Sequence, residues 1–237
     1  MSGPIALVGS GGYTEPLLDV ERGLIAGRPP RYVQIPTAAA PEGPQRLRYW
    51  LELGRDQAER IGVSPVPLIV TNRDEANDPA IAAEVAGAGL VCLSGGDAVF
   101  LADTLRDTLL WQAVVDAWHE GAALAGCAAG AVALGHEIVD PRRPLRDPAP
   151  GLGLLPGLRV LPGFDRVLAR LPDVVLRPFT AGDGERITVG IDADTALVGG
   201  GHAWTVRGRG SVRLFGQGGR RDLRAGDTLR FGDVARR

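Results

Sequence analysis

The sequence predicts an open, doubly wound α/β sheet. Five short apolar runs recur in the first half of the chain, at residues 4–9, 31–36, 66–70, 90–95 and 122–127. Each run is continuously apolar rather than alternating, which is typical of parallel strands buried on both faces. Segments with helical composition lie between the runs, at residues 41–61, 74–88, 98–106 and 109–120. This alternation favours a three-layer fold around a mostly parallel sheet.

The second half of the chain has a different pattern. Residues 140–166 are rich in Pro, Gly and Arg, and we expect mostly loops or short turns there. From residue 185 onward, short β-like runs are separated by Gly-rich turns, which indicates β-hairpins that complete the fold. The sequence therefore predicts one domain over residues 1–237.

Composition excludes several classes of function. The formal net charge of −2 offers no electrostatic attraction for nucleic acid or an anionic membrane. The chain contains no lysine, so lysine Schiff-base chemistry is excluded. Its two cysteines and three histidines lack the spacing of a disulfide framework or a metal site, and we expect no metal and no cofactor. Without a basic leader or a long apolar run, the expected location is the cytoplasm.

Two turns follow predicted strands at their carboxyl ends, where doubly wound sheets bind ligands. The first is Gly95-Gly96-Asp97, which leads into the predicted helix at residues 98–106. Glycines let the backbone approach a ligand closely, and the amides of such a turn can face an anion. The same sequence is also typical of an ordinary tight turn.

The second turn, Gly126-Cys127-Ala128-Ala129-Gly130, has the pattern of a nucleophile elbow. An elbow needs small residues two positions before and after the nucleophile, because the turn from strand to helix is crowded. The amide that follows the nucleophile then serves as an oxyanion donor. Ala128 fits the nucleophile position, and Cys127 fits it when the register moves by one residue.

Several motifs together resemble peptidase family S51, which contains dipeptidase E and the cyanophycinases. They are VQIPTAAAP at 33–41, LSGGDAVFL at 93–101, AGCAAGAVAL at 125–134, LPGFDR at 161–166 and GIDADTALV at 190–198. The resemblance implies a flavodoxin-like α/β fold of the class I glutamine amidotransferase type. It also implies serine-type peptidase chemistry, with a serine on the elbow, a downstream Pro-His-Phe histidine and a second oxyanion amide from the Gly-Gly turn.

At the implied reaction centre, this sequence departs from the family pattern at three positions. The serine position holds Ala128, and the histidine position holds Gly163. The residue after Gly-Gly-Asp, often Gln in the family, is Ala98. The resemblance places the two oxyanion amides at Gly96 and Ala129, which backbone groups of any residue can supply.

The departures predict a homologue without catalysis. A nucleophile and its base act as a unit, so the absence of both removes efficient peptidolysis. We therefore expect a binding or regulatory protein whose ligand is a small acidic peptide or another carboxylate. Candidate ligand contacts are Arg142, Arg143 and Arg166, on loops expected over the carboxyl edge of the sheet.

Three alternatives stay open at the level of sequence. The chain could be an active peptidase or amidohydrolase on small Asp- or Glu-containing peptides, with Cys127 or Ser10 as a relocated nucleophile. It could be a variant of an active enzyme in which alanine replaces the serine at Ala128. It could also be a partner-binding protein, such as a homodimer, whose cleft is unused.

Overall fold

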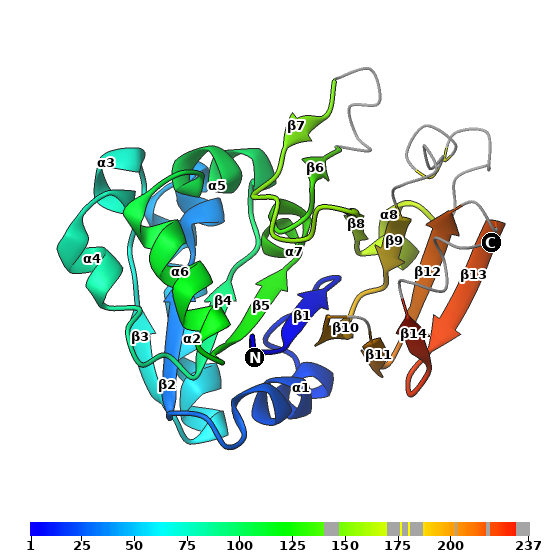
Figure 1. Cartoon of the computed structure of the whole chain (residues 1–237), viewed down its shortest axis with the longest axis horizontal. Helices are drawn as coiled ribbons and strands as arrows, with labels where there is room; N and C mark the ends of the chain where they lie inside the picture. The colour runs from blue at the N-terminus through cyan, green and yellow to red at the C-terminus, as the bar shows by residue number, and fades with distance from the viewer. Residues whose placement is uncertain are drawn as a thin grey trace.

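The centre of the molecule is an eight-stranded sheet (Figure 1). The computed structural model describes residues 1–139, 147–169, 176, 180, 187–201, 203–216 and 219–230. Five adjacent strands run parallel, in the spatial order β1 (Ile5–Val8), β5 (Ala123–Cys127), β4 (Leu90–Leu93), β2 (Arg31–Ile35) and β3 (Ser64–Pro67). Beyond β1, the sheet continues through three antiparallel strands, β10 (Thr195–Gly200), β11 (Ala203–Gly208) and β14 (Thr228–Arg230).

Helices cover both faces of this sheet, which confirms the predicted three-layer α/β class. One face carries α1 (Glu15–Ile25) and α2 (Pro44–Ile61). The 3-10 helix η1 (Thr37–Glu42) immediately precedes α2 in the chain. The other face carries α3 (Arg73–Ala76), α4 (Pro79–Ala83), α5 (Ala98–Leu105), α6 (Leu109–His119) and α7 (Ala129–Ala133). Helix α1 was not predicted, and the single helix expected over 74–88 is two short ones.

The alternation of side chains along each strand assigns them to two cores. In β1, Ile5 and Leu7 join the larger core under α5 and α6, whereas Ala6 and Val8 face α1 and α2. Because successive strand residues point to opposite faces, the same rule applies to β5. Its last residue, Cys127, therefore lies on the α1 side of the sheet.

A second, four-stranded sheet contains β8 (Leu158–Pro162), β9 (Ile187–Ile191), β12 (Ser211–Gly216) and β13 (Gly219–Arg224). The predicted C-terminal hairpins are present as β10–β11 and β12–β13. The expectation of loops up to residue 166 was wrong for β8, which pairs in parallel with β9, and for helix α8 (Phe164–Val167). A short ribbon of β6 (Glu137–Ile138) and β7 (Ala149–Pro150) stands beside α7.

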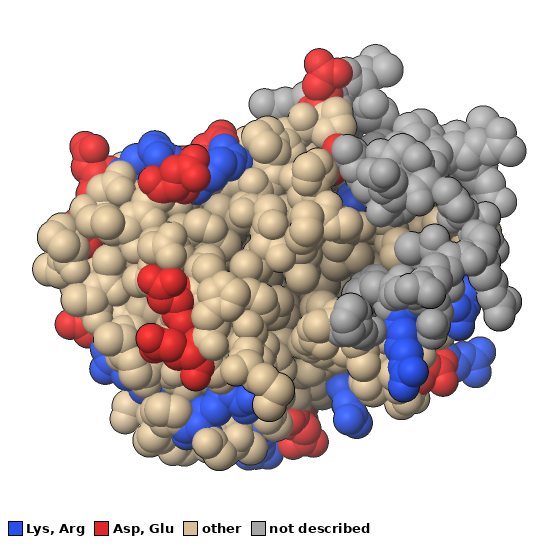
Figure 2. Space-filling view, viewed as in Figure 1, with Lys and Arg blue, Asp and Glu red and all other residues tan. Residues whose placement is uncertain are grey.

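Charged side chains of both signs are interspersed on the face shown in Figure 2. This mixture agrees with the small formal net charge of −2. Across the described residues, every helix is too short or too polar to cross a membrane.

Candidate functional site

The turn between β5 and α7 has the strained backbone of an elbow. Ala128 adopts φ 48° and ψ −106°, a conformation that residues with a side chain rarely populate. A Cβ built on Gly126 would lie 2.7 Å from the amide nitrogen of Ala131, and one on Gly130 would lie 2.3 Å from the carbonyl oxygen of Leu93. The crowding on both sides centres the turn on Ala128 rather than on its neighbour Cys127.

The Gly-Gly turn after β4 lies directly beside this elbow. A Cβ built on Gly95 would stand 3.6 Å from the Cβ of Ala128. Gly96 has φ 142°, and a Cβ there would lie 2.1 Å from the carbonyl oxygen of Ala38, so the position requires glycine. Outside helices and strands, no described carbonyl accepts a hydrogen bond from the amide of Gly96 or Ala129. Both amides are thus available to an oxygen of a ligand.

Asp97 closes the Gly-Gly turn as the N-cap of α5. Its Oδ1 accepts a hydrogen bond from the amide of Phe100 at 3.0 Å. This bond satisfies one of the amides that a helix leaves unpaired at its start, and the carboxylate remains exposed.

A buried hydrogen-bond network, which sequence reasoning missed, lies behind the Gly-Gly turn. Ser94 is fully buried, and its hydroxyl lies 3.2 Å from the hydroxyl of Tyr13. The amide of Gln34 donates to Tyr13 Oη at 2.8 Å and to the carbonyl of Trp50 at 2.6 Å. Burial raises the pKa of Tyr13 well above its usual value, so the phenol stays protonated. The network connects β1, β2, β4 and α2 at the residue that precedes Gly95.

Cys127 lacks the properties of a nucleophile. Its side chain is 4% exposed, and burial raises the pKa of the thiol to about 12, so the thiolate is scarce at neutral pH. A Cβ built on Gly12 would lie 2.9 Å from Cys127 Sγ, which shows the thiol packed against the loop after β1. The cysteine alternative therefore has no geometric support.

Gly163, at the predicted histidine position, begins α8 in the left-handed conformation, with φ 57° and ψ 40°. A Cβ built there would lie 3.8 Å from Ser10 Oγ, which is buried without a hydrogen-bond partner among the described residues. The nearby Asp165 accepts a hydrogen bond from the amide of Ala193 at 2.8 Å, so it joins α8 to the chain after β9.

The histidines of the described part of the chain lie elsewhere. His119 is bonded to the hydroxyl of Ser2 at the end of α6, and His136 is exposed before β6. Neither lines the cleft at the elbow. His202 lies outside the described residues. Those residues also contain no group of three or more His, Cys, Asp or Glu arranged to hold a metal ion.

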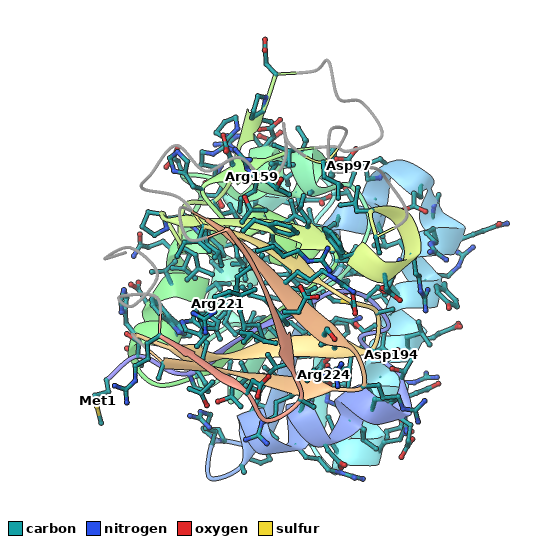
Figure 3. All side chains as sticks on the ribbon, turned by 90° about the vertical axis from the view of Figure 1, so that its right-hand side faces the viewer. Met1, Asp97, Arg159, Asp194, Arg221 and Arg224 are labelled. Carbon is teal, nitrogen blue, oxygen red and sulfur yellow. The ribbon has the colours of Figure 1, made fainter. Side chains whose placement is uncertain are left out.

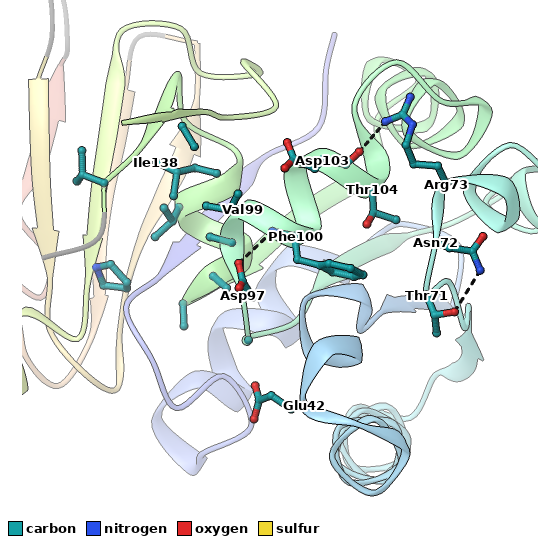
Figure 4. A pocket seen from close by; sticks show the side chains of 18 of the residues that line it. Glu42, Thr71, Asn72, Arg73, Asp97, Val99, Phe100, Asp103, Thr104 and Ile138 are labelled. Atoms are coloured by element: carbon teal, nitrogen blue, oxygen red, sulfur yellow. Dashed lines mark hydrogen bonds between the residues drawn. The ribbon is translucent and has the colours of Figure 1, made fainter. Parts of the chain in front are cut away.

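A cleft of about 880 Å³ opens at the elbow, and Gly96, Asp97, Ala128 and Ala129 all line it (Figure 4). Further lining residues come from the loop after β3, from α5 and α7, and from the β6–β7 ribbon. Sequence reasoning did not single out most of these residues, because they come from distant segments and those of α5 and α7 that lie within the quoted motifs are ordinary apolar positions. The volume is in the range of small-molecule sites.

Of the three arginines expected to contact a ligand, Arg166 is exposed on α8 and does not line the cleft. Arg142 and Arg143 lie outside the described residues. The structure therefore brings together the two turns, whereas the basic contacts are not part of the described cleft.

Comparison with known proteins agrees with this fold. The sequence model of peptidase family S51 matches residues 5–206. A crystal structure of a peptidase from an acI-B1 Actinobacterium is 36% identical, covers 98% of both chains and superposes with a TM-score of 0.89. A peptidase E-like protein from Listeria monocytogenes EGD-e, 16% identical over 88% of this chain and 99% of its own, shares the fold with a TM-score of 0.62.

Curated relatives include cyanophycinases. The one from Trichormus variabilis is 29% identical over 204 residues, which cover 80% of this chain and 64% of the relative. The one from Synechococcus elongatus is 33% identical over 193 residues, which cover 76% of this chain and 56% of the relative. The matches thus span less than two thirds of the length of these relatives. The match to the family and the full-length structural similarity establish that the chain belongs to peptidase family S51.

Proposed function

We propose that this chain is a non-catalytic member of the family that binds a small peptide or carboxylate in the elbow cleft. The observation that carries the proposal is the methyl group of Ala128 at the strained position of the elbow. A methyl group cannot attack a carbonyl carbon, and Gly163 has no side chain that could accept a proton. Efficient hydrolysis by the serine mechanism needs both groups.

Binding, unlike hydrolysis, requires only groups that the chain retains. The amides of Gly96 and Ala129 can donate hydrogen bonds to a carbonyl or carboxylate oxygen beside the Ala128 methyl group. Backbone donors of this kind stay in place when the nucleophile is absent. A cleft of about 880 Å³ has room for a ligand of several residues.

The test is a hydrolysis panel of Asp-Xaa and Glu-Xaa dipeptides, together with cyanophycin, the polymer that gives the curated relatives their name. The unmodified protein is compared with Ala128→Ser, Gly163→His and the double variant. We expect turnover only from the double variant, because the nucleophile and its base act together.

Turnover by the unmodified protein would overturn the proposal. The search for another nucleophile would then begin at Ser10, whose hydroxyl lies nearest the Gly163 position. Inactivity of all four proteins, with ligand binding still detected, would leave the binding function standing and show that two substitutions do not restore chemistry.

A further inference from the structure

The two sides of the elbow cleft differ in chemistry. Ile138 lies on one side of α5 (Figure 4), and with Val99, Val132, Val139 and Leu168 it supplies apolar lining that we call the apolar chamber. Three of these side chains are buried, Val132 and Ile138 at 5% exposure and Leu168 at 1%. On the far side of α5 lie polar residues from the loop after β3 (Figure 4).

Charge in the described lining is predominantly negative. Four carboxylates line the cleft, those of Glu42, Asp97, Asp103 and Asp147, against the single guanidinium of Arg73. The Arg73 Nη1 atom donates to the carbonyl oxygens of Asp103 and Arg106 at 2.6 and 2.9 Å, so it is committed to the end of α5.

Within the part of the chain that the structure describes, two of the four carboxylates have no ion pair. Glu42 pairs with Arg46, and Asp103 pairs with Arg106, each at 3.2 Å. Asp97, which adjoins the Gly-Gly turn, has no ion pair among the described residues, and the same holds for Asp147. The arginines of β13, Arg221 and Arg224, lie well away from Asp97 (Figure 3).

We infer that the cleft selects a peptide with a free amino terminus and an apolar first side chain. The apolar chamber takes the side chain, Asp97 attracts the ammonium group, and the amides of Gly96 and Ala129 hold the first carbonyl oxygen. An acidic first side chain binds more weakly, since it would lose its hydration in the chamber and meet carboxylates of its own sign. The inference rests on the proposed binding function and differs from the acidic ligand expected from the sequence, which stays untested.

The experiment is calorimetric titration of the unmodified protein with Leu-Gly, Gly-Gly, Asp-Gly and acetyl-Leu-Gly. Burial of the leucine side chain should make Leu-Gly bind about tenfold to a hundredfold more tightly than Gly-Gly. Asp-Gly should bind more weakly than Gly-Gly. Loss of the ammonium group should weaken acetyl-Leu-Gly by up to about fivefold relative to Leu-Gly, the upper end of the range for an exposed ion pair.

Substitutions at Val99 and Asp97 test whether the apolar preference and the ammonium preference arise at these residues. Val99→Ser should weaken binding of Leu-Gly more than binding of Gly-Gly. Val115→Ser, at a matched partly buried valine on α6 outside the cleft, should change neither. Asp97→Asn keeps a side chain that can cap α5 and should remove the difference between Leu-Gly and acetyl-Leu-Gly.

Tighter binding of Asp-Gly than of Leu-Gly would overturn the apolar preference while leaving a binding function intact. Absence of binding by all four peptides at millimolar concentration would also overturn it. Each sample is analysed for cleavage after titration, because hydrolysis of a bound peptide would overturn the proposed non-catalytic function and leave the measured preference standing.

Discussion

Glu21 makes the stability of this protein dependent on pH in a way that one substitution can isolate. The side chain projects from α1 into the layer between that helix and the sheet and is 4% exposed. Burial raises the pKa of its carboxyl group to about 8, against the smaller lowering effects of Gln57, Tyr32 and the positive charge of Arg60. The folded protein therefore holds a proton on Glu21 at neutral pH, and the unfolded chain does not.

The sign and size of the effect follow from linkage. A group whose pKa is higher in the folded state stabilises that state most below its unfolded pKa, and the stabilisation is lost as pH rises to the folded pKa. For Glu21 this window runs from its usual pKa of 4.5 to about 8. One proton is worth about 1.4 kcal/mol per pH unit, so the free energy of unfolding should fall by about 4 kcal/mol between pH 5 and pH 8.

Glu21→Gln removes this titration while keeping the size and polarity of the side chain. Urea denaturation at pH 5, 6, 7 and 8 gives the free energy of unfolding of both proteins, and their difference cancels every other titrating group. We expect Glu21→Gln to gain about 4 kcal/mol relative to the unmodified protein over this range. The control is Glu52→Gln, at an exposed position of α2, which should show no such gain. Parallel profiles for Glu21→Gln and the unmodified protein would refute the reasoning.

Three further outcomes follow from the same structure. Cys127 and Cys92 are buried, and burial raises the pKa of both thiols. Neither cysteine should therefore react with a disulfide reagent at pH 8 until urea unfolds the protein. Rapid labelling of Cys127 in the folded protein would contradict this prediction. Gly130→Ala should lower the free energy of unfolding in urea by about 3 kcal/mol or more, because its Cβ would lie 2.3 Å from a carbonyl oxygen of β4. Its control, Gly23→Ala in α1, places a Cβ that meets nothing within 4 Å and should raise the free energy of unfolding by up to about 1 kcal/mol. Ala128→Gly should stabilise by about 1 kcal/mol through relief of the positive φ, and a lower urea midpoint would count against strain at that residue.

Four of the five parallel strands were predictable because they are buried and read as continuous apolar runs. The fifth, β3, is a mostly exposed edge strand at Ser64–Pro67, whereas the apolar run had predicted a strand at 66–70. Helix α1 escaped prediction because an interior Gly23 lowers its helix propensity and a buried Glu21 interrupts its apolar face. Strand β8 escaped because its five residues lie among prolines and glycines, and it becomes a strand only by pairing with β9. Pairing between distant segments has no local sequence signal.

Some parts of the candidate site could be predicted from the sequence, and others could not. The elbow and the Gly-Gly turn carry local motifs, because close backbone contacts demand glycine at fixed spacing. The residue pattern alone allowed both Ala128 and Cys127, and the family resemblance favoured Ala128. The backbone conformation agrees, because the strain falls at Ala128. The apolar chamber could not be predicted as a unit. Val99 and Val132 lie inside quoted motifs, but they and Ile138 come from separate elements and look like ordinary core residues in sequence.

The shape of the elbow has causes that do not involve the side chain at its apex. Gly126 and Gly130 are required by the packing of α7 against β5 and β4, and the amide of Ala128 donates to the carbonyl of Val8 at 2.9 Å. These contacts hold the strained turn whether residue 128 carries a hydroxyl or a methyl group. Elbow geometry is therefore evidence for the fold, whereas the side chains at 128 and 163 decide between hydrolysis and binding. Ligand preference is decided separately, by the cleft lining, which is why the binding titration and the hydrolysis panel test different statements.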